Sequence, residues 1–175
     1  MTPILTTDRL SLRPRAMADA EQIAALIGDY DVARMLYSVP YPYTLEDARE
    51  WVSGSLGKPG DLTWVLDDGT GAVGVASLNN FDGIKRTLGF WLGKPYWGRG
   101  FMSEVVRTVI TWAFDEGGLD RIESSAFMDN IASRRLHAKF GFTEGEGALL
   151  DAPARGEPAP TVTFSLSRED WTPTP

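Results

Sequence analysis

The stretch that decides the fold is KPYWGRGFMSEVV, residues 94–106. Two glycines, Gly98 and Gly100, stand one residue apart and follow a cluster of proline and aromatic residues. Apolar residues then recur at intervals of three and four, which predicts a helix from near Gly98 to the glycine pair 117–118. The start of a helix presents backbone N–H groups without internal partners, and glycine lets a ligand approach them closely. The segment therefore predicts a turn that holds a phosphate group.

The glycine pattern alone leaves alternatives, because two glycines before a helix also form ordinary tight turns. A Walker loop requires Gly-Lys-Ser or Gly-Lys-Thr, which this chain lacks. A dinucleotide-binding turn requires a third glycine three residues after the second, where the chain has Ser103. Arg99 adds a guanidinium between the two glycines, which suits pairing with a phosphate.

Composition limits the class of protein. The chain has 175 residues, 43% of them hydrophobic, which predicts one globular domain over residues 1–175. It shows neither a signal peptide nor an apolar run near the roughly 18 residues of a membrane span, so we expect a cytoplasmic protein without a membrane partner. The net charge of −7 argues against binding of nucleic acid. With no cysteine and one histidine, no metal site is expected.

Periodicity and turn residues predict a mixed α/β fold. Strands are expected at 9–14, 62–66, 72–78, 87–92, 121–127 and 161–167, and loops at 57–61, 79–86 and 153–160. Besides the helix near Gly98, helices are expected to begin at Asp19, Thr44 and Asn130. Asp19 with Gln22 has the spacing of a capping box, and Thr44 with Asp47 has the same spacing.

Four quoted stretches together carry a resemblance to a known family. They are DRLSLRP (8–14), YTLEDAREWV (43–52), TLGFWLGKPYWGRGFMSEVV (87–106) and NIASRRLHAKFGF (130–142). Over about residues 8–145, the chain resembles the GNAT superfamily of acetyl-CoA-dependent N-acetyltransferases, and most of all its Rim-type branch, which acetylates N-terminal amines of ribosomal proteins. The resemblance implies a single-domain, mostly antiparallel sheet flanked by helices, with one splayed parallel pair formed by strands 87–92 and 121–127.

The resemblance also implies acetyl-CoA as cosubstrate. The backbone amides that would hold its pyrophosphate belong to Gly98, Arg99, Gly100, Phe101, Met102 and Ser103. The main chain near Trp91 and Leu92 would pair with the pantetheine arm like an added strand. The family has glutamine or arginine where this chain has Pro95, a departure that removes one side-chain contact and leaves the main-chain donors in place.

Two positions at the start of the last helix match family positions near the pantetheine arm and the sulfur. They are Asn130 and Ser133. Asn130 also fits a helix N-cap, and Ser133 also fits a solvated serine. For the acid that protonates the leaving thiolate, Ser133 is the first candidate. His137 is the second, because it stands where many family members carry a tyrosine, although a lone histidine is more often structural.

The general base and the acceptor stay less defined. Many family members carry a glutamate where this chain has Thr87, and neither Glu104 nor Glu123 is selected as its replacement. Near neutral pH a larger share of α-amines than of lysine side chains is uncharged, so a site without a strong base favours a protein N-terminal α-amine. The acceptor is expected near Tyr41, Trp64 and Asn79, although aromatic residues mostly build core.

Two other functions fit the same residues. The acceptor can be a small amine such as an aminoglycoside or a polyamine. Thr87 and the missing tyrosine also permit a catalytically inactive sensor that only binds acyl-CoA. By analogy with related enzymes, a homodimer is a further expectation.

Overall fold

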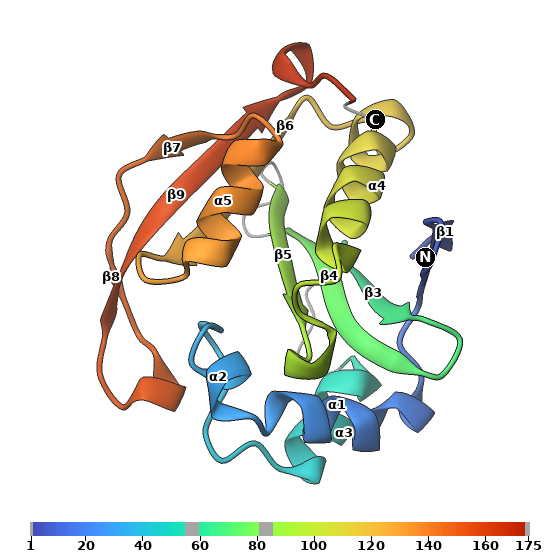
Figure 1. Cartoon of the computed structure of the whole chain (residues 1–175), viewed down its shortest axis with the longest axis vertical. Helices are drawn as coiled ribbons and strands as arrows, with labels where there is room; N and C mark the ends of the chain where they lie inside the picture. Colours follow the sequence, from blue (N-terminus) through green and yellow to red (C-terminus); the bar gives the residue numbers. More distant parts are fainter. Residues whose placement is uncertain (1, 55–59, 81–85, 174–175) are drawn as a thin grey trace.

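The computed structural model describes residues 2–54, 60–80 and 86–173. Its strands are β1 (Leu5–Thr6), β2 (Ser11–Arg13), β3 (Leu62–Asp67), β4 (Ala72–Asn80), β5 (Arg86–Leu92), β6 (Arg121–Phe127), β7 (Thr143–Gly145), β8 (Leu149–Leu150) and β9 (Ala159–Ser167). Its α-helices are α1 (Ala20–Ile27), α2 (Tyr30–Ala33), α3 (Leu45–Ser53), α4 (Phe101–Asp115) and α5 (Ile131–Lys139). Together they form a mixed α/β fold (Figure 1).

The strands form one open sheet in the order β1-β2-β3-β4-β5-β6-β9-β7, and β8 pairs separately with β9. Every pairing is antiparallel except that between β5 and β6. The six expected strands and four expected helices are all present, with ends shifted by up to a few residues. The short elements β1, β7, β8 and α2 were not expected. The expected loops at 57–61 and 79–86 lie partly outside the described residues.

Two hydrophobic cores lie on opposite faces of the sheet because alternate residues of a strand point to opposite faces. On one face, the apolar stripe of α4 packs on the sheet; from the strands this core takes Trp64, Leu66, Leu78, Leu88 and Ile122, and from α4 it takes Val105, Val109, Ile110 and Phe114. On the other face, α1 and α3 cover Val65 and Val75. Each fully buried aliphatic side chain of this kind contributes about 1.5–3 kcal/mol.

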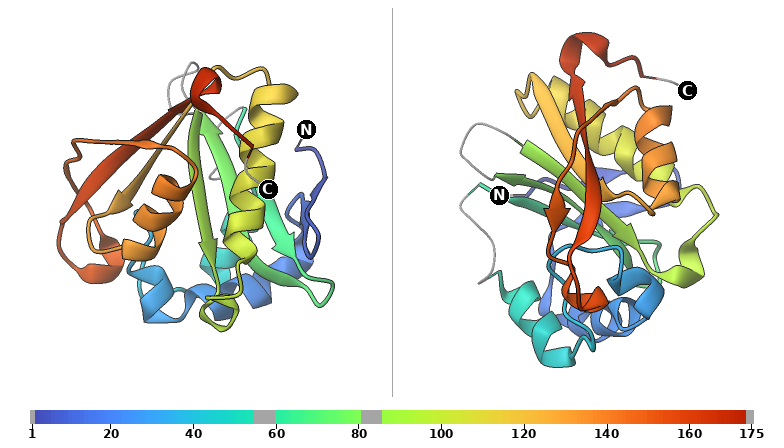
Figure 2. Two further views of the ribbon diagram at one scale, coloured as in Figure 1. Left: turned by 45° about the horizontal axis from the view of Figure 1, so that its top comes forward. Right: turned by 90° about the vertical axis from the view of Figure 1, so that its left-hand side faces the viewer.

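The parallel pair separates after a short contact. β5 and β6 pair only from Arg86 with Ile122 to Leu88 with Ser124. Both strands continue beyond that point, and they diverge toward the end of the molecule where α2 lies (Figure 2). This confirms the splayed pair, and the divergence opens the sheet beside the start of α4.

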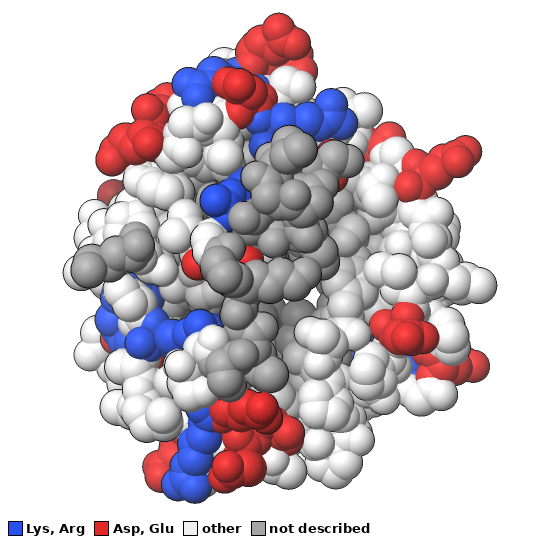
Figure 3. Space-filling view, turned by 180° about the vertical axis from the view of Figure 1, so that it is seen from behind, with Lys and Arg blue, Asp and Glu red and all other residues white. Residues whose placement is uncertain are grey.

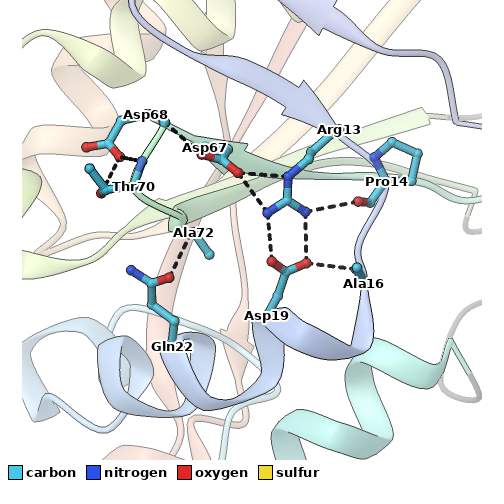
Figure 4. Close-up of polar contacts among 10 residues, drawn as sticks. Arg13, Pro14, Ala16, Asp19, Gln22, Asp67, Asp68, Thr70 and Ala72 are labelled. Carbon is cyan, nitrogen blue, oxygen red and sulfur yellow. Dashed lines mark hydrogen bonds and ion pairs between the residues drawn. The ribbon is translucent and has the colours of Figure 1, made fainter.

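The expected capping box at Asp19 is wrong. Asp19 does stand at the N-cap of α1, but its side chain makes no capping hydrogen bond to that helix. It accepts two bonds from the Arg13 guanidinium, at 2.7 and 3.0 Å, and one from the N–H of Ala16 at 2.7 Å (Figure 4). The Gln22 side chain instead accepts from the N–H of Ala72. These contacts attach α1 to β2 and β4, which a local sequence pattern does not reveal.

The helix predicted to begin at Thr44 is present, and Thr44 and Asp47 form a capping box at its start. The Thr44 hydroxyl accepts from the N–H of Asp47 at 3.1 Å, and the Asp47 carboxylate accepts from the N–H of Thr44 at 2.7 Å. Among the described residues, no helix is both long enough and apolar enough to cross a membrane.

Candidate functional site

The glycine turn before α4 has the backbone geometry that only glycine adopts readily. Gly98 has a φ of +73° and Gly100 a φ of +80°. Within the described chain, nothing accepts a hydrogen bond from the backbone N–H groups of residues 98–102. The N–H of Ser103 already donates to the Gly100 carbonyl at 3.1 Å, so the free donors end at residue 102, one residue earlier than expected. The turn therefore offers a row of unpaired N–H groups at the positive end of the helix dipole.

Arg9 holds this turn from outside. Its Nε donates to Glu104 at 2.6 Å, one of its terminal nitrogens donates to the Arg99 carbonyl at 2.8 Å, and its guanidinium lies 4.5 Å from the centre of the Phe101 ring. Burial raises the pKa of Glu104, but the hydrogen bonds from Arg9 and Thr7 outweigh that effect and lower it overall. Glu104 thus stabilises the turn through its bonds to Arg9 and Thr7, and its lowered pKa makes it poorly suited to act as a base.

At the divergence of β5 and β6, main-chain groups of β5 are left without a neighbouring strand. The N–H of Gly93 donates to Val73, which extends the antiparallel register of β4 and β5. Because bonded and non-bonded pairs alternate in such a register, Trp91 directs its main chain to β4, whereas Phe90 and Leu92 direct theirs away from it. The Leu92 carbonyl accepts from Trp97 Nε1 at 2.8 Å. The gap thus receives the N–H groups of Phe90 and Leu92, and Trp91 contributes its side chain alone.

The start of α5 faces the same gap. The Asn130 side-chain oxygen accepts from the N–H of Ser133 at 3.2 Å and so caps the helix. Ser103 on α4 accepts from Lys139 at 3.1 Å, which ties the far end of α5 to the glycine turn.

Two hollows open on this region. The first, which we call the turn groove, has a volume of about 580 Å³. Its wall comes from α2, the end of β5, the glycine turn and the start of α5: Val32, Met35, Leu36, Phe90, Trp91, Leu92, Tyr96, Trp97, Gly98, Gly100, Phe101, Met102, Ser103, Asp129, Asn130, Ile131, Ala132, Ser133 and Leu136. Nearly all the residues expected to bind the cofactor line this groove; Arg99 does not, and its guanidinium lies over the Tyr96 ring at 5.5 Å.

The second hollow, which we call the sheet cavity, has a volume of about 600 Å³. It lies between α3, the segment 36–43 and one face of β3, β4 and β5, and is lined by Arg15, Ile27, Leu36, Tyr37, Ser38, Val39, Pro40, Tyr43, Asp47, Glu50, Trp51, Asp61, Thr63, Val75, Ser77, Asn79, Gly89, Phe90 and Trp91. Leu36, Phe90 and Trp91 line both hollows. The two hollows therefore meet at the splayed end of β5.

Of the three residues expected at the acceptor, only Asn79 lines the sheet cavity. The expectation for Trp64 is wrong, because it is fully buried in the opposite core and its Nε1 donates to the Pro3 carbonyl at 2.7 Å. Its neighbour Thr63 faces the cavity instead, as the two-residue period of a strand requires. Tyr41 is also outside the cavity: it is 46% exposed and packs edge-on against Tyr30.

His137 lies in the core and not at either hollow, so its expected role as an acid is wrong. It is 2% exposed, stacks on Phe164 at 4.0 Å and packs edge-on to Phe142 at 5.0 Å. Its Nδ1 lies 2.7 Å from the Ser133 carbonyl, and its Nε2 lies 2.8 Å from Ser124 Oγ. Burial lowers the pKa of His137 to about 4, so the ring is neutral near pH 7 and lacks the acidic imidazolium proton that a general acid would donate.

Sequence reasoning missed the walls that distant segments supply. The largest omission is the segment after α2, which brings Leu36 and Tyr37 to the hollows. Tyr43 is a second tyrosine that lines the sheet cavity, and its pKa is raised to about 12 by burial and by the nearby Asp47 carboxylate. Within the described ranges, no group of three histidine, aspartate or glutamate residues is placed to hold a metal ion. Seen from behind, acidic and basic side chains lie in mixed groups (Figure 3).

Comparison with known proteins gives one consistent result. Residues 9–143 match the family described as Acetyltransferase (GNAT) domain. Among curated proteins, the chain is 31% identical to YoaA, an uncharacterized N-acetyltransferase of Bacillus subtilis, over 95% of this chain and 97% of that protein. It is 28% identical to YdaF, a proposed ribosomal N-acetyltransferase of the same organism, over 94% of each chain. It is 29% identical to an Aspergillus fumigatus FsC-acetyl coenzyme A-N(2)-transacetylase, over 97% of this chain and 78% of that protein.

Solved structures share the fold. RimL, a ribosomal-protein α-N-acetyltransferase solved in complex with coenzyme A, superposes with a TM-score of 0.80 at 20% identity, covering 94% of this chain and 98% of that one. At that identity the match bears on the arrangement of helices and strands.

Proposed function

The chain belongs to the GNAT acetyltransferase family and is an N-acetyltransferase, and on that premise we propose that it transfers the acetyl group of acetyl-CoA to the α-amine of a protein N-terminus. In this proposal the turn groove holds CoA, with the pyrophosphate on the free N–H groups of residues 98–102. The sheet cavity holds the acceptor. Asn130 and Ser133, which line the turn groove, contact the pantetheine arm of CoA as it runs from the turn groove toward the sheet cavity.

The observation that carries the proposal is the junction of the two hollows. Leu36, Phe90 and Trp91 line both, so a thioester at the inner end of the groove meets an amine at the inner end of the cavity. The main chain of β5 passes through this junction with the N–H groups of Phe90 and Leu92 directed into the gap. A pantetheine arm can pair with these groups as an added strand does.

The chemistry follows from those groups. The amine nitrogen attacks the thioester carbonyl carbon, a C–N bond forms, and the carbonyl oxygen becomes an oxyanion. The Phe90 or Leu92 N–H stabilises that oxyanion. The C–S bond then breaks, sulfur leaves as a thiolate, and the nitrogen loses one proton while the sulfur gains one. Ser133, which lines the groove, is the hydroxyl we assign to the sulfur. Because a thiol has a pKa near 8.5, the thiolate needs only modest help to leave.

The choice of an α-amine rests on the lack of a carboxylate on the row of β4 and β5 nearest the junction. Asn79 faces Thr87 across these strands, and Ser77 faces Gly89. An amine with a pKa of about 7.7–8.0 loses its proton near neutral pH more readily than lysine does. The name of YdaF supports a ribosomal protein as acceptor, whereas the name of the Aspergillus relative supports a small amine.

A panel of acceptors tests the proposal. Labelled acetyl-CoA is incubated with N-terminal peptides of ribosomal proteins, the same peptides blocked at the α-amine, an aminoglycoside and a polyamine, and products are read by mass spectrometry. Acetylation of the free peptides at the α-amine supports the proposal, and the blocked peptides are the matched control. Acetylation of the small amines alone moves the function to that class. A thermal shift with acetyl-CoA without turnover on any acceptor leaves the acyl-CoA sensor.

A further inference from the structure

Tyr37 lines the sheet cavity, and its hydroxyl is buried without a hydrogen-bond partner among the residues that the structure describes. Ser125 lies near it without completing a bond: its hydroxyl lowers the pKa of Tyr37, while burial has the larger effect and raises it. A buried unpaired hydroxyl is destabilising, so its presence at a cavity wall needs a reason.

The position of Tyr37 in the fold supplies that reason. Its neighbour Leu36 lines both hollows, so Tyr37 stands beside the junction. Ser125 is the first residue of β6 after the pairing with β5 ends. By the alternation of the strand, Ser125 lies on the same sheet face as Gly89, which lines the cavity. The Tyr37 hydroxyl, near Ser125, is therefore at the divergence of the two strands and on the sheet face that borders the sheet cavity.

Tyr37 is also held firmly in this place. Its ring packs against Phe127 at 4.8 Å. The guanidinium of Arg155 lies 4.2 Å from the centre of the Phe127 ring on which Tyr37 packs, and its Nε donates to the Arg34 carbonyl at 2.7 Å. The same guanidinium donates to both oxygens of Asp129 at 2.9 Å. The segment that carries Tyr37 is thus fixed to the end of β6 and to the start of α5.

We propose that Tyr37 is a catalytic residue whose hydroxyl oxygen accepts a hydrogen bond from the attacking amine. This role rests on the proposed function. The bond turns the nitrogen lone pair toward the thioester carbon and stabilises the positive charge that develops on nitrogen as the C–N bond forms. Tyr37 keeps its own proton throughout, and the proton that the nitrogen loses passes to the sulfur or to water.

The test compares Tyr37→Phe with Tyr30→Phe. The first variant removes only the unpaired hydroxyl and keeps the ring on Phe127. The second is the matched control, because Tyr30 is a nearby tyrosine in the preceding helix α2, is 42% exposed and lines neither hollow. For Tyr37→Phe we expect kcat/KM for the acceptor to fall at least tenfold, the Kd of acetyl-CoA to stay unchanged, and Tm to stay equal or rise. For Tyr30→Phe we expect all three to stay near wild type.

The combination of lower activity with equal or higher Tm separates a catalytic role from a structural one, since loss of a structural group lowers Tm. Wild-type kcat/KM in Tyr37→Phe overturns the role of Tyr37 and leaves the proposed function standing. A loss of activity that comes with a lower Tm or a weaker Kd for acetyl-CoA also overturns it. If the wild-type protein binds acetyl-CoA but acetylates none of the acceptors, the proposed function fails, and this role fails with it.

Discussion

The Nε2 of His137 lies 2.8 Å from the Oγ of Ser124, and that Oγ lies 2.8 Å from the carbonyl of Leu88. Leu88 and Ser124 are the last paired residues of β5 and β6. The Ser133 carbonyl, 2.7 Å from Nδ1, favours the proton of the neutral ring on that nitrogen, while the one hydroxyl proton of Ser124 is donated to the Leu88 carbonyl. The only histidine of the chain therefore joins α5 to the exact place where the sheet divides, and its contribution is structural.

This placement predicts a pH-dependent stability. The pKa of His137 is about 4 in the folded protein, below the ordinary 6.5, because burial disfavours the charged ring. The unfolded chain therefore binds the proton more tightly, and the free energy of unfolding falls as pH drops from 6.5 toward 4. The full loss is roughly 3 kcal/mol, since one pKa unit is worth about 1.4 kcal/mol.

Urea unfolding at pH 7.5, 6.5, 5.5 and 5.0 measures this loss, and His137→Leu is the comparison. The variant should be less stable at pH 7.5 but should show a flatter dependence between pH 6.5 and 5.0. The same slope in both proteins would mean that the buried ring is not the titrating group.

The glycine turn yields a prediction about cofactor affinity. Gly98→Ala places a side chain where N–H groups are expected to meet the pyrophosphate, and we expect the Kd of CoA to rise at least about tenfold, which corresponds to 1.4 kcal/mol. Gly118→Ala is the matched control: Gly118 has a φ of +69° against +73° at Gly98, and an added Cβ meets nothing within 4 Å at either. Both variants should lose a similar amount of stability, as thermal unfolding reports. Equal CoA affinities in the two variants would place the pyrophosphate elsewhere.

Replacing Arg155 should weaken binding of the pantetheine end of acetyl-CoA more than binding of its nucleotide end. Its side chain is 14% exposed and bonds Asp129, which lines the turn groove near α5. Arg155→Lys keeps the charge but cannot reproduce two parallel bonds to a carboxylate. Calorimetry should therefore show weaker binding of acetyl-CoA but unchanged binding of 3′,5′-ADP, which has no pantetheine arm. Arg168→Lys is the control, because Arg168 is exposed and bonds the Leu119 carbonyl instead. Parallel weakening for both ligands would count against a local effect.

The ion pair that attaches α1 to the sheet should dominate local stability. Asp19 has a 6% exposed side chain and is bonded twice by Arg13, whereas Asp67 shares the same guanidinium at 20% exposure. Removing one partner of a buried pair costs about 3–5 kcal/mol, so Asp19→Ala should lower the free energy of unfolding by about that amount. Asp67→Ala should cost clearly less. Urea midpoints at constant m-value measure both, and a larger loss in Asp67→Ala would reverse the assignment.

Periodicity predicted the long elements well because local residues determine them. The stripe of α4 and the alternation of β9 are visible in the chain, and the glycine turn follows from two glycines separated by one residue. The splayed strand pair came from a resemblance to a family, since no local pattern states which strands lie side by side.

The remainder of the site depends on contacts between distant segments. Trp64 and Thr63 show the limit: a strand pattern predicts that they face opposite sides, but not which side is the cavity. His137 appears as a polar residue on a helix, and only the three phenylalanine rings packed around it show that it belongs to the core. Arg155 Nε bonds the Arg34 carbonyl, 121 positions earlier in the chain, so no local sequence window contains that partner.

Because the β5–β6 pairing ends early, β5 has main-chain groups in the middle of the sheet that no neighbouring strand among the described residues pairs with. The amide protons of Phe90 and Leu92 should exchange with deuterated solvent much faster than their neighbours on the same strand while the groove is free. A molecule lying along β5 as a surrogate strand would slow that exchange at alternate residues only. The spacing of protected amides would then report, without a crystal, that the ligand completes the sheet.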